Sequence, residues 1–129
     1  MTEREPIRTS DAPPPAGSYS QAIRHNGVVW LAGQTPRTAD GVHVSGQSFE
    51  EQARQALRNV EAVATAAGTS LAHALSVTVY LRDPERRFEF DAVWREFVVE
   101  PFPARAIVQS DLPGFDIEIS AVCGHAQPS

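Results

Sequence analysis

The stretch that decides the fold lies near the C-terminus and reads Phe102-Pro103-Ala104-Arg105-Ala106-Ile107-Val108-Gln109-Ser110-Asp111-Leu112-Pro113-Gly114-Phe115-Asp116-Ile117-Glu118. The apolar run at 106–108 predicts one strand, residues 111–114 predict a turn, and a second strand follows. Arg105 opens the first strand and Glu118 lies near the start of the second, so each charge stands among residues that favour burial. A buried charge is costly unless it is paired or used. The pattern therefore predicts either a structural Arg105–Glu118 ion pair or a functional site.

A long helix is predicted in the middle of the chain. Ser48 and Glu51 form a capping box, in which Ser48 caps the helix and Glu51 reaches back. Apolar residues then recur at helical spacing as far as about Ala67, and Gly68 follows as a left-handed stop. The apolar face is small and rich in alanine, which favours close packing on a sheet.

A second helix is predicted after Asp83-Pro84, a pair that provides an N-cap and a proline at the first helical position. It is expected to run to about Val98, because Pro101 and Pro103 follow. The inward side chains of this helix are expected to be Phe88, Val93, Trp94 and Phe97.

Strands are predicted on both sides of the long helix. The clearest is Ala74–Leu81, in which apolar residues alternate with Ser76, Thr78 and Tyr80. Near the N-terminus, residues 19–25 and 28–32 flank Asn26-Gly27, the pair best suited to a type I′ hairpin turn. Gly33 ends the second of these strands and allows a bulge or a close backbone approach. A short edge strand is also possible at 42–44.

This order of elements, β-β-(β)-α-β-α-β-β, predicts an α+β fold with a mixed β-sheet and two helices packed on one face. Residues 17–129 are expected to form a single domain. Residues 1–16 are polar and proline-rich and are expected to be a flexible N-terminal arm, mobile or held on the surface. We expect Val77, Val79 and Ile119 on the sheet face that the helices leave open. A homo-oligomer that closes this face is the simplest arrangement.

Composition excludes several classes of partner. The chain of 129 residues has a formal net charge of -5 and no basic stripe, which argues against nucleic-acid binding. No apolar run approaches the ~20 residues that span a bilayer, and the N-terminus shows no apolar targeting segment. Cys123 is the only cysteine, which rules out an internal disulfide and fits a reducing compartment. We therefore expect a cytoplasmic protein without nucleic-acid or membrane partners.

Motifs for metals and cofactors are missing from the sequence. It contains no GxGxxG, Walker, GxSxG or HExxH pattern. Cys123 lies in a terminal strand and is expected to act as a small hydrophobe, not a nucleophile. We therefore expect neither a metal nor a cofactor. The histidines are scattered without ligand spacing and are expected to be ordinary surface or satisfied residues: His25, His43, His73 and His125.

From about Pro15 to Val122 the chain resembles the RidA/YjgF family of reactive-imine deaminases. Each matching segment is weak alone, but together they occur in the family's order and spacing. The resemblance implies a chorismate-mutase-like α+β fold and a homotrimer with sites between subunits, in agreement with the open sheet face. The segments are Tyr19-Ser20-Gln21-Ala22, Ala32-Gly33-Gln34, Ala66-Ala67-Gly68, Pro103-Ala104-Arg105, Leu112-Pro113 and Ile117-Glu118-Ile119.

The resemblance implies a role for four residues. Arg105 matches the family's arginine that binds the substrate carboxylate, a task that suits a planar guanidinium with two parallel N–H donors. Glu118 matches the glutamate that positions the attacking water. Tyr19 matches the tyrosine that flanks the pocket, and Gly33 the glycine whose backbone lines it.

The chain departs from the family at three positions. Ala32 stands where the family usually has serine, so a hydroxyl is missing from the expected substrate-binding site. Ile107, which we expect to bind the substrate, replaces a frequent cysteine, a change that matters less if only its backbone contacts the ligand. Asp91 lies near a position where many members have asparagine.

The activity implied by the resemblance is hydrolytic deamination of 2-aminoacrylate-type enamines and imines, without a cofactor, to a 2-keto acid and ammonia. The expected partner is thus a small imino or keto acid. Three alternatives stay open: a non-catalytic trimer that binds small carboxylates, a deaminase for a larger enamine from aromatic catabolism, and a ribonuclease. The acidic charge and the lack of a basic aromatic groove argue against the last.

Overall fold

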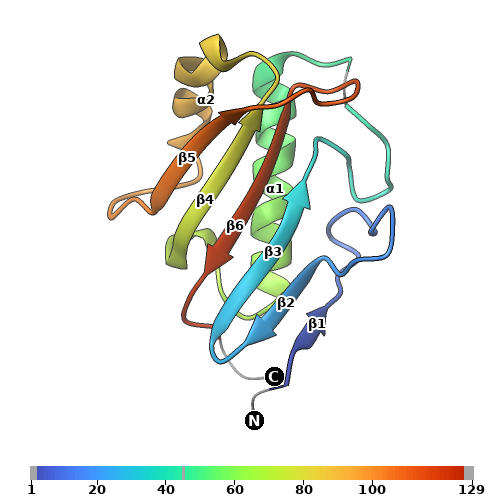
Figure 1. The fold of residues 1–129 in the computed structure, drawn as a ribbon, viewed down its shortest axis with the longest axis vertical. Coiled ribbons are helices and arrows are strands. Elements are labelled where there is room, and N and C mark those ends of the chain that lie inside the picture. Colours follow the sequence, from blue (N-terminus) through green and yellow to red (C-terminus); the bar gives the residue numbers. More distant parts are fainter. Residues whose placement is uncertain (1–2, 45, 127–129) are drawn as a thin grey trace.

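The computed structural model describes residues 3–44 and 46–126. The strands form one six-stranded sheet in the order β1-β2-β3-β6-β4-β5 (Figure 1). β4 and β5 are parallel and the other neighbours are antiparallel, so the predicted mixed sheet is confirmed. The strands are β1 (Glu5–Ile7), β2 (Ala22–His25), β3 (Val28–Gln34), β4 (Ala74–Leu81), β5 (Ala104–Gln109) and β6 (Ile117–Cys123), and the helices are α1 (Phe49–Ala66), α2 (Arg87–Trp94) and the 3₁₀ turns η1 (Leu71–His73) and η2 (Pro84–Arg86).

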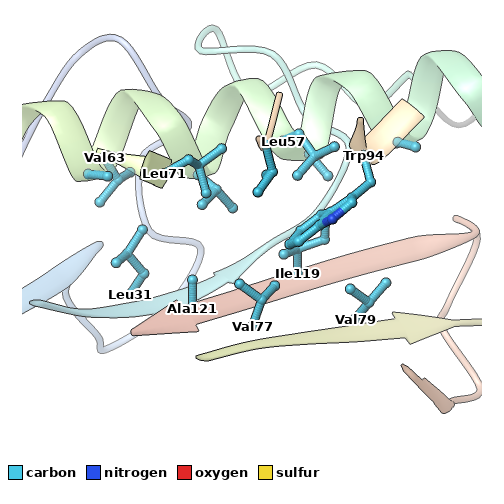
Figure 2. Packing of buried hydrophobic residues seen from close by; sticks show 14 of the residues in the cluster. Leu31, Leu57, Val63, Leu71, Val77, Val79, Trp94, Ile119 and Ala121 are labelled. Atoms are coloured by element: carbon cyan, nitrogen blue, oxygen red, sulfur yellow. The ribbon is translucent and has the colours of Figure 1, made fainter. Parts of the chain in front are cut away.

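Both α-helices pack on the same face of the sheet, as predicted (Figure 1). Figure 2 shows Leu57 of α1 pointing down toward Val77 and Ile119 of the central strands, and Val63 above Leu31 of β3. The side chains at this contact are buried and form one apolar cluster, whose burial is the main source of stability in such a layer. No helix in the described part of the chain is long and apolar enough to cross a membrane.

The prediction of which residues lie on the open face was wrong. Val77, Val79 and Ile119 are almost completely buried and point toward the helices (Figure 2). The alternation in β4 was predicted correctly, but a period of two residues separates two faces without telling which one the helices cover. The open face carries small polar side chains of β4 together with Trp30 of β3, which is 56% exposed.

The N-terminal segment contains a strand that the sequence pattern did not predict. β1 pairs with β2, with Ile7 opposite Ala22. The side chain of Gln21 donates hydrogen bonds to the backbone oxygens of Thr9 (3.1 Å) and Pro13 (2.9 Å). The part of the expected arm from β1 to Pro13 is therefore held by strand pairing with β2 and by hydrogen bonds to Gln21. β1 was not predictable because it is short and contains a proline, which an edge strand tolerates.

Several local predictions on the path of the chain are confirmed. Asn26 and Gly27 have positive φ values of 51° and 77°, as a type I′ turn requires. Ser48 accepts a hydrogen bond from the Glu51 backbone N–H at 3.2 Å and caps α1. Gly68 has a φ of 84° and follows the helix as its left-handed stop. Residues 42–44, in contrast, form only an isolated bridge between His43 and Arg37 in the described chain.

The second helix is shorter than predicted, and one of its four predicted inward residues, Phe88, points outward. Asp83 caps a 3₁₀ turn, η2, by accepting from the Glu85 backbone N–H at 3.0 Å, and α2 begins only after it. Within α2, Phe90 shares one face with Val93 and Trp94, which follow it by three and four residues, whereas Phe88 lies on the other side of the helix. As a result Phe88 is 74% exposed, and Phe90 is the buried aromatic residue instead. The predicted burial of Val93 and Trp94 is confirmed.

Candidate functional site

One hollow brings three of the predicted site residues together. A cavity of about 240 Å³ is bordered by Tyr19, Gly33 and Glu118. Its remaining walls come from the loop before β2, from the end of β3 and the loop after it, which supplies Arg37 and His43, and from Phe115 in the loop before β6. Strand β6 supplies Glu118, β3 supplies Gly33, and the loop that leads into β2 supplies Tyr19. Three separate segments therefore converge on this cavity, which we call the Glu118 cavity.

Glu118 is half-buried in this cavity. Burial raises the pKa of its carboxyl group above the usual value of 4.5. Across residues 3–44 and 46–126 no hydrogen bond or ion pair involves its carboxylate. The carboxylate oxygen Oε2 lies where a side chain on residue 33 would be, so the space it occupies exists because that residue is glycine. Such a carboxylate is available to a ligand or a water molecule.

Tyr19 lies at the mouth of the Glu118 cavity and is half exposed. Its hydroxyl oxygen accepts a hydrogen bond from the Ala16 backbone N–H at 3.0 Å. The residue also borders a larger surface hollow of about 610 Å³ between residues 7–10 and 14–21. The structure therefore places Tyr19 at the edge of the cavity, as a flanking residue.

Arg105 lies in a different hollow. This second cavity, of about 280 Å³, is lined by side chains from the end of α2 and the residue after it, and from the segment 102–105 at the entry to β5, and we call it the Arg105 cavity. The guanidinium of Arg105 lies over the rings of Trp94 (5.1 Å) and Phe90 (5.7 Å). Its Nη1 donates a hydrogen bond to Oδ1 of Asp91 at 3.0 Å. The residues around the cavity are Asp91, Trp94, Arg95, Phe102, Pro103 and Arg105.

Strand register puts Arg105 and Glu118 on opposite faces of the sheet. Arg105 is paired with Val77, which points toward the helices. Glu118 is paired with Tyr80, which belongs to the other face of β4. Directly paired residues point to the same side of a sheet. The prediction of an Arg105–Glu118 ion pair, one of the two that the sequence left open, is therefore wrong within one protomer. Arg105 pairs with Asp91 instead.

The two other predicted binding residues do not border either cavity. Ile107 is paired with Val79, and its partly buried side chain packs against the apolar core. Ala32 lies beside Gly33, and its backbone N–H donates to the carbonyl of Gln21 at 2.9 Å. The pairing of β3 with β6 shifts register between Leu31 and Gln34, which confirms the irregularity expected at Gly33.

The contacts of Asp91 were not predicted from the sequence. Its two oxygens contact two arginines, Arg105 at 3.0 Å and Arg95 at 3.2 Å. The spacing of Asp91 and Arg95 along the helix was visible in the sequence and is typical of a helical ion pair. The contact with Arg105 joins residues 14 positions apart across a helix and a strand, so only the tertiary structure shows it.

The described residues contain no group of three or more histidine, cysteine, aspartate or glutamate side chains arranged to hold a metal ion. Cys123 is buried at the end of β6, and burial raises the pKa of its thiol to about 11. At neutral pH the residue is therefore a protonated thiol, which is a poor nucleophile.

Comparison with known proteins places the chain in a family. Residues 9–124 match the family model described as Endoribonuclease L-PSP. The RutC family protein y4sK of Sinorhizobium fredii is 39% identical over 120 residues, which cover 92% of this chain and 95% of that protein.

Solved structures agree with this assignment. RidA from the Antarctic bacterium Psychrobacter sp. superposes with a TM-score of 0.88 at 32% identity, over 94% of this chain and 99% of that one. TdcF of E. coli, crystallised with bound serine, gives a TM-score of 0.86 at 28% identity, over 95% of this chain and 99% of that one. The resemblance to RidA/YjgF proteins is thus confirmed, and the chain belongs to the Endoribonuclease L-PSP family, which includes the RutC and Rid proteins.

Proposed function

We propose that the protein is a cofactor-independent deaminase that hydrolyses 2-imino acids derived from 2-aminoacrylate-type enamines. The observation that supports this best is the carboxylate of Glu118, half-buried against Gly33 and without a partner among the described residues. A general base is most effective when its pKa is closer to the working pH than that of an ordinary carboxyl group. Burial shifts the pKa of Glu118 in that direction.

The proposed reaction begins with a protonated imine, a zwitterion with a carboxylate and a C=NH₂⁺ group. Glu118 takes a proton from water as the water oxygen bonds to C2 and the C=N electron pair moves to nitrogen. The proton held by Glu118 then passes to the amino group, and the C–N bond breaks with its electron pair leaving on ammonia. The hydroxyl oxygen becomes the keto oxygen as its proton returns to Glu118, which passes it to the departing ammonia to give ammonium. Arg105 would hold the carboxylate through parallel N–H donors and reduce the entropic barrier.

We propose that the working unit is a homotrimer with each site between two subunits. Within one protomer Arg105 and Glu118 point to opposite sheet faces, and β4 lies between their strands. A small ligand therefore needs Arg105 from one subunit and Glu118 from the next. The exposure of Trp30 on the open face also favours coverage by another copy.

The experiment that tests the function is an assay of ammonia and keto-acid release from freshly generated 2-aminoacrylate. We expect the wild type to accelerate release over buffer and Arg105→Lys to lose most of this activity, because lysine keeps the charge but not the fork of donors. Arg86→Lys makes the same change at an exposed pair with Glu89 and should leave the rate unchanged. A wild type no faster than buffer, or a fully active Arg105→Lys variant, would refute the proposal.

A non-catalytic protein that binds small carboxylates is the second candidate. It is favoured by the absence of the expected serine hydroxyl at Ala32 and by the serine bound in the relative TdcF. The same assay separates the two, since a binding protein takes up the keto acid without releasing ammonia. A larger enamine from aromatic catabolism is a variant of the first proposal, tested by comparing imines derived from several amino acids.

The name of the family model refers to RNA cleavage. A net charge of -5 does not favour binding to a polyanion, so we propose no ribonuclease activity for this chain. The cytoplasm is the compartment we propose, in keeping with a single cysteine that is buried and free.

A further inference from the structure

The carboxylate of Asp91 lies between two guanidinium groups. Its Oδ1 accepts from Nη1 of Arg105 at 3.0 Å, and its Oδ2 lies 3.2 Å from Nε of Arg95. All three side chains border the Arg105 cavity. The wall of this cavity therefore carries one anionic side chain, Asp91, and two cationic side chains, Arg95 and Arg105.

The three side chains differ in how firmly they are held. The side chains of Arg105 and Asp91 are 26% and 30% exposed, and that of Arg95 is 73% exposed. Trp94 and Phe90 lie under the guanidinium of Arg105 and restrict its plane. The Arg105–Asp91 pair is thus a fixed feature of the cavity wall, whereas Arg95 can move away without unpacking the core.

The hydrogen bond to Asp91 uses only one end of Arg105. Among the described residues, Nη1 is the one atom of this guanidinium with a hydrogen-bond partner, so Nε and Nη2 remain available as parallel donors. A ligand carboxylate can bind to them without displacing Asp91. It then lies beside the Asp91 carboxylate, and a like charge nearby weakens its binding.

The substrate and the product of the proposed reaction differ in the charge next to their carboxylate. The protonated imino acid carries a cationic nitrogen next to its carboxylate, whereas the keto acid is an anion only. We propose that Asp91 is a specificity-determining residue that makes the Arg105 cavity favour a carboxylate with an adjacent cationic nitrogen over the keto-acid anion. This inference rests on the proposed function, because it concerns the carboxylate site of Arg105. The consequence of this preference is that the keto-acid product binds more weakly than the imino-acid substrate.

Calorimetric titration with L-alanine and with pyruvate tests the inference. The two compounds differ at C2, where one carries an ammonium group and the other a keto oxygen. In Asp91→Asn the pyruvate dissociation constant should fall and that of L-alanine should rise or stay constant. The ratio of the two constants should move by roughly fivefold toward pyruvate, the upper range for a partly exposed charge pair.

Two further variants make the result decisive. Glu89→Gln removes the same charge from the same helix, at a pair with Arg86 outside the cavity, and should leave the ratio unchanged. Arg95→Gln changes an exposed side chain and should move the ratio the other way, toward L-alanine. It therefore also tests the inference if Asp91→Asn does not fold.

The outcomes separate this inference from the proposed function. Pyruvate binding that depends on Arg105, with an unchanged ratio in Asp91→Asn, overturns the inference and leaves the function standing. A wild type that binds neither compound overturns both. An equal change in Glu89→Gln would show that only the overall charge matters, which also overturns the inference.

Discussion

The carboxylate of Glu118 occupies the space that a side chain on Gly33 would fill. A Cβ atom added to Gly33 would overlap Oε2 of Glu118 and lie 3.0 Å from its Cδ atom. The two residues come from neighbouring strands, at the point where the pairing of β3 with β6 shifts register. The glycine thus provides room for the carboxylate, and the carboxylate is the one titratable group of the proposed chemistry that this cavity holds.

Gly33→Ala should therefore displace Glu118 without unfolding the protein. The group that must move is the end of a flexible side chain, so the free energy of unfolding should fall little. The rate of imine hydrolysis should fall at least about tenfold, because a misplaced base loses its alignment with water. Gly46→Ala is the matched control, since a Cβ atom there meets nothing within 4 Å. An unchanged rate in Gly33→Ala would show that Glu118 does not act from its observed position.

Glu118→Gln should lower turnover by roughly 10²–10⁴-fold if the carboxylate is the general base. The active form is deprotonated, and burial raises the pKa, so the wild-type kcat/KM should decline toward low pH with a midpoint above 4.5. The glutamine variant should lack this acid limb.

The stability of Glu118→Gln distinguishes a catalytic role from a structural one. A carboxyl group whose pKa is raised in the folded state is more stable protonated, so above that pKa its charge costs stability. The neutral variant should therefore unfold at neutral pH no more readily than the wild type, as urea titration can measure. A large loss of stability would assign Glu118 to the fold instead of the reaction.

Ala32→Ser should restore the hydroxyl that the family usually has at this position. One neutral hydrogen bond contributes about 0.5–1.5 kcal/mol, which corresponds to roughly a twofold to tenfold change in rate. Ala32 borders neither cavity of the single protomer, and we propose that it faces the substrate in the site between subunits. Alanine would make that site smaller-walled and more apolar than serine, so the wild type should prefer bulkier 2-imino acids, and the variant should shift the ratio of rates toward 2-iminopropionate. An unchanged ratio would mean that this side chain does not face the substrate.

Local features of the fold were predictable because short-range chemistry determines them. The bounds of β4 follow from the alternation of apolar and polar residues. The turn at Asn26-Gly27 follows from the ease with which these two residues adopt a positive φ, and the cap at Ser48 from a hydroxyl beside backbone N–H groups that have no partner within the helix. The burial of Phe90 in place of Phe88 was also predictable, because Phe90 lies three and four residues before Val93 and Trp94 and shares their helix face, whereas Phe88 does not. The 3₁₀ turn η2, which delays the start of α2, was not predictable in this way.

The sequence predicted which residues belong to the site but not how they are arranged in space. Glu118 and Gly33 belong together in the structure, as the resemblance implied. The partner of Arg105 could not be read from the chain, since Asp91 reaches it across the contact of α2 with β5. Which sheet face each charge occupies depends on the register of three strands, and register is a property of the assembled sheet.

Mixing two inactive variants tests the assembly and the shared site together. Light scattering should first show a homotrimer for Arg105→Lys and for Glu118→Gln. When the two variants are unfolded together and refolded in equal amounts, a site between subunits can receive an intact Arg105 from one chain and an intact Glu118 from the other. Random assembly makes about one quarter of the sites complete, so about a quarter of the wild-type activity should return.

The unmixed variants, refolded in the same way, provide the baseline for this recovery. A site built within one protomer would gain nothing from mixing, because no chain in the sample carries both residues. A stable monomer at micromolar concentration would refute the trimer directly. Recovery is the expected result, because Arg105 and Glu118 point to opposite faces of the sheet and a single chain does not bring them to one small ligand.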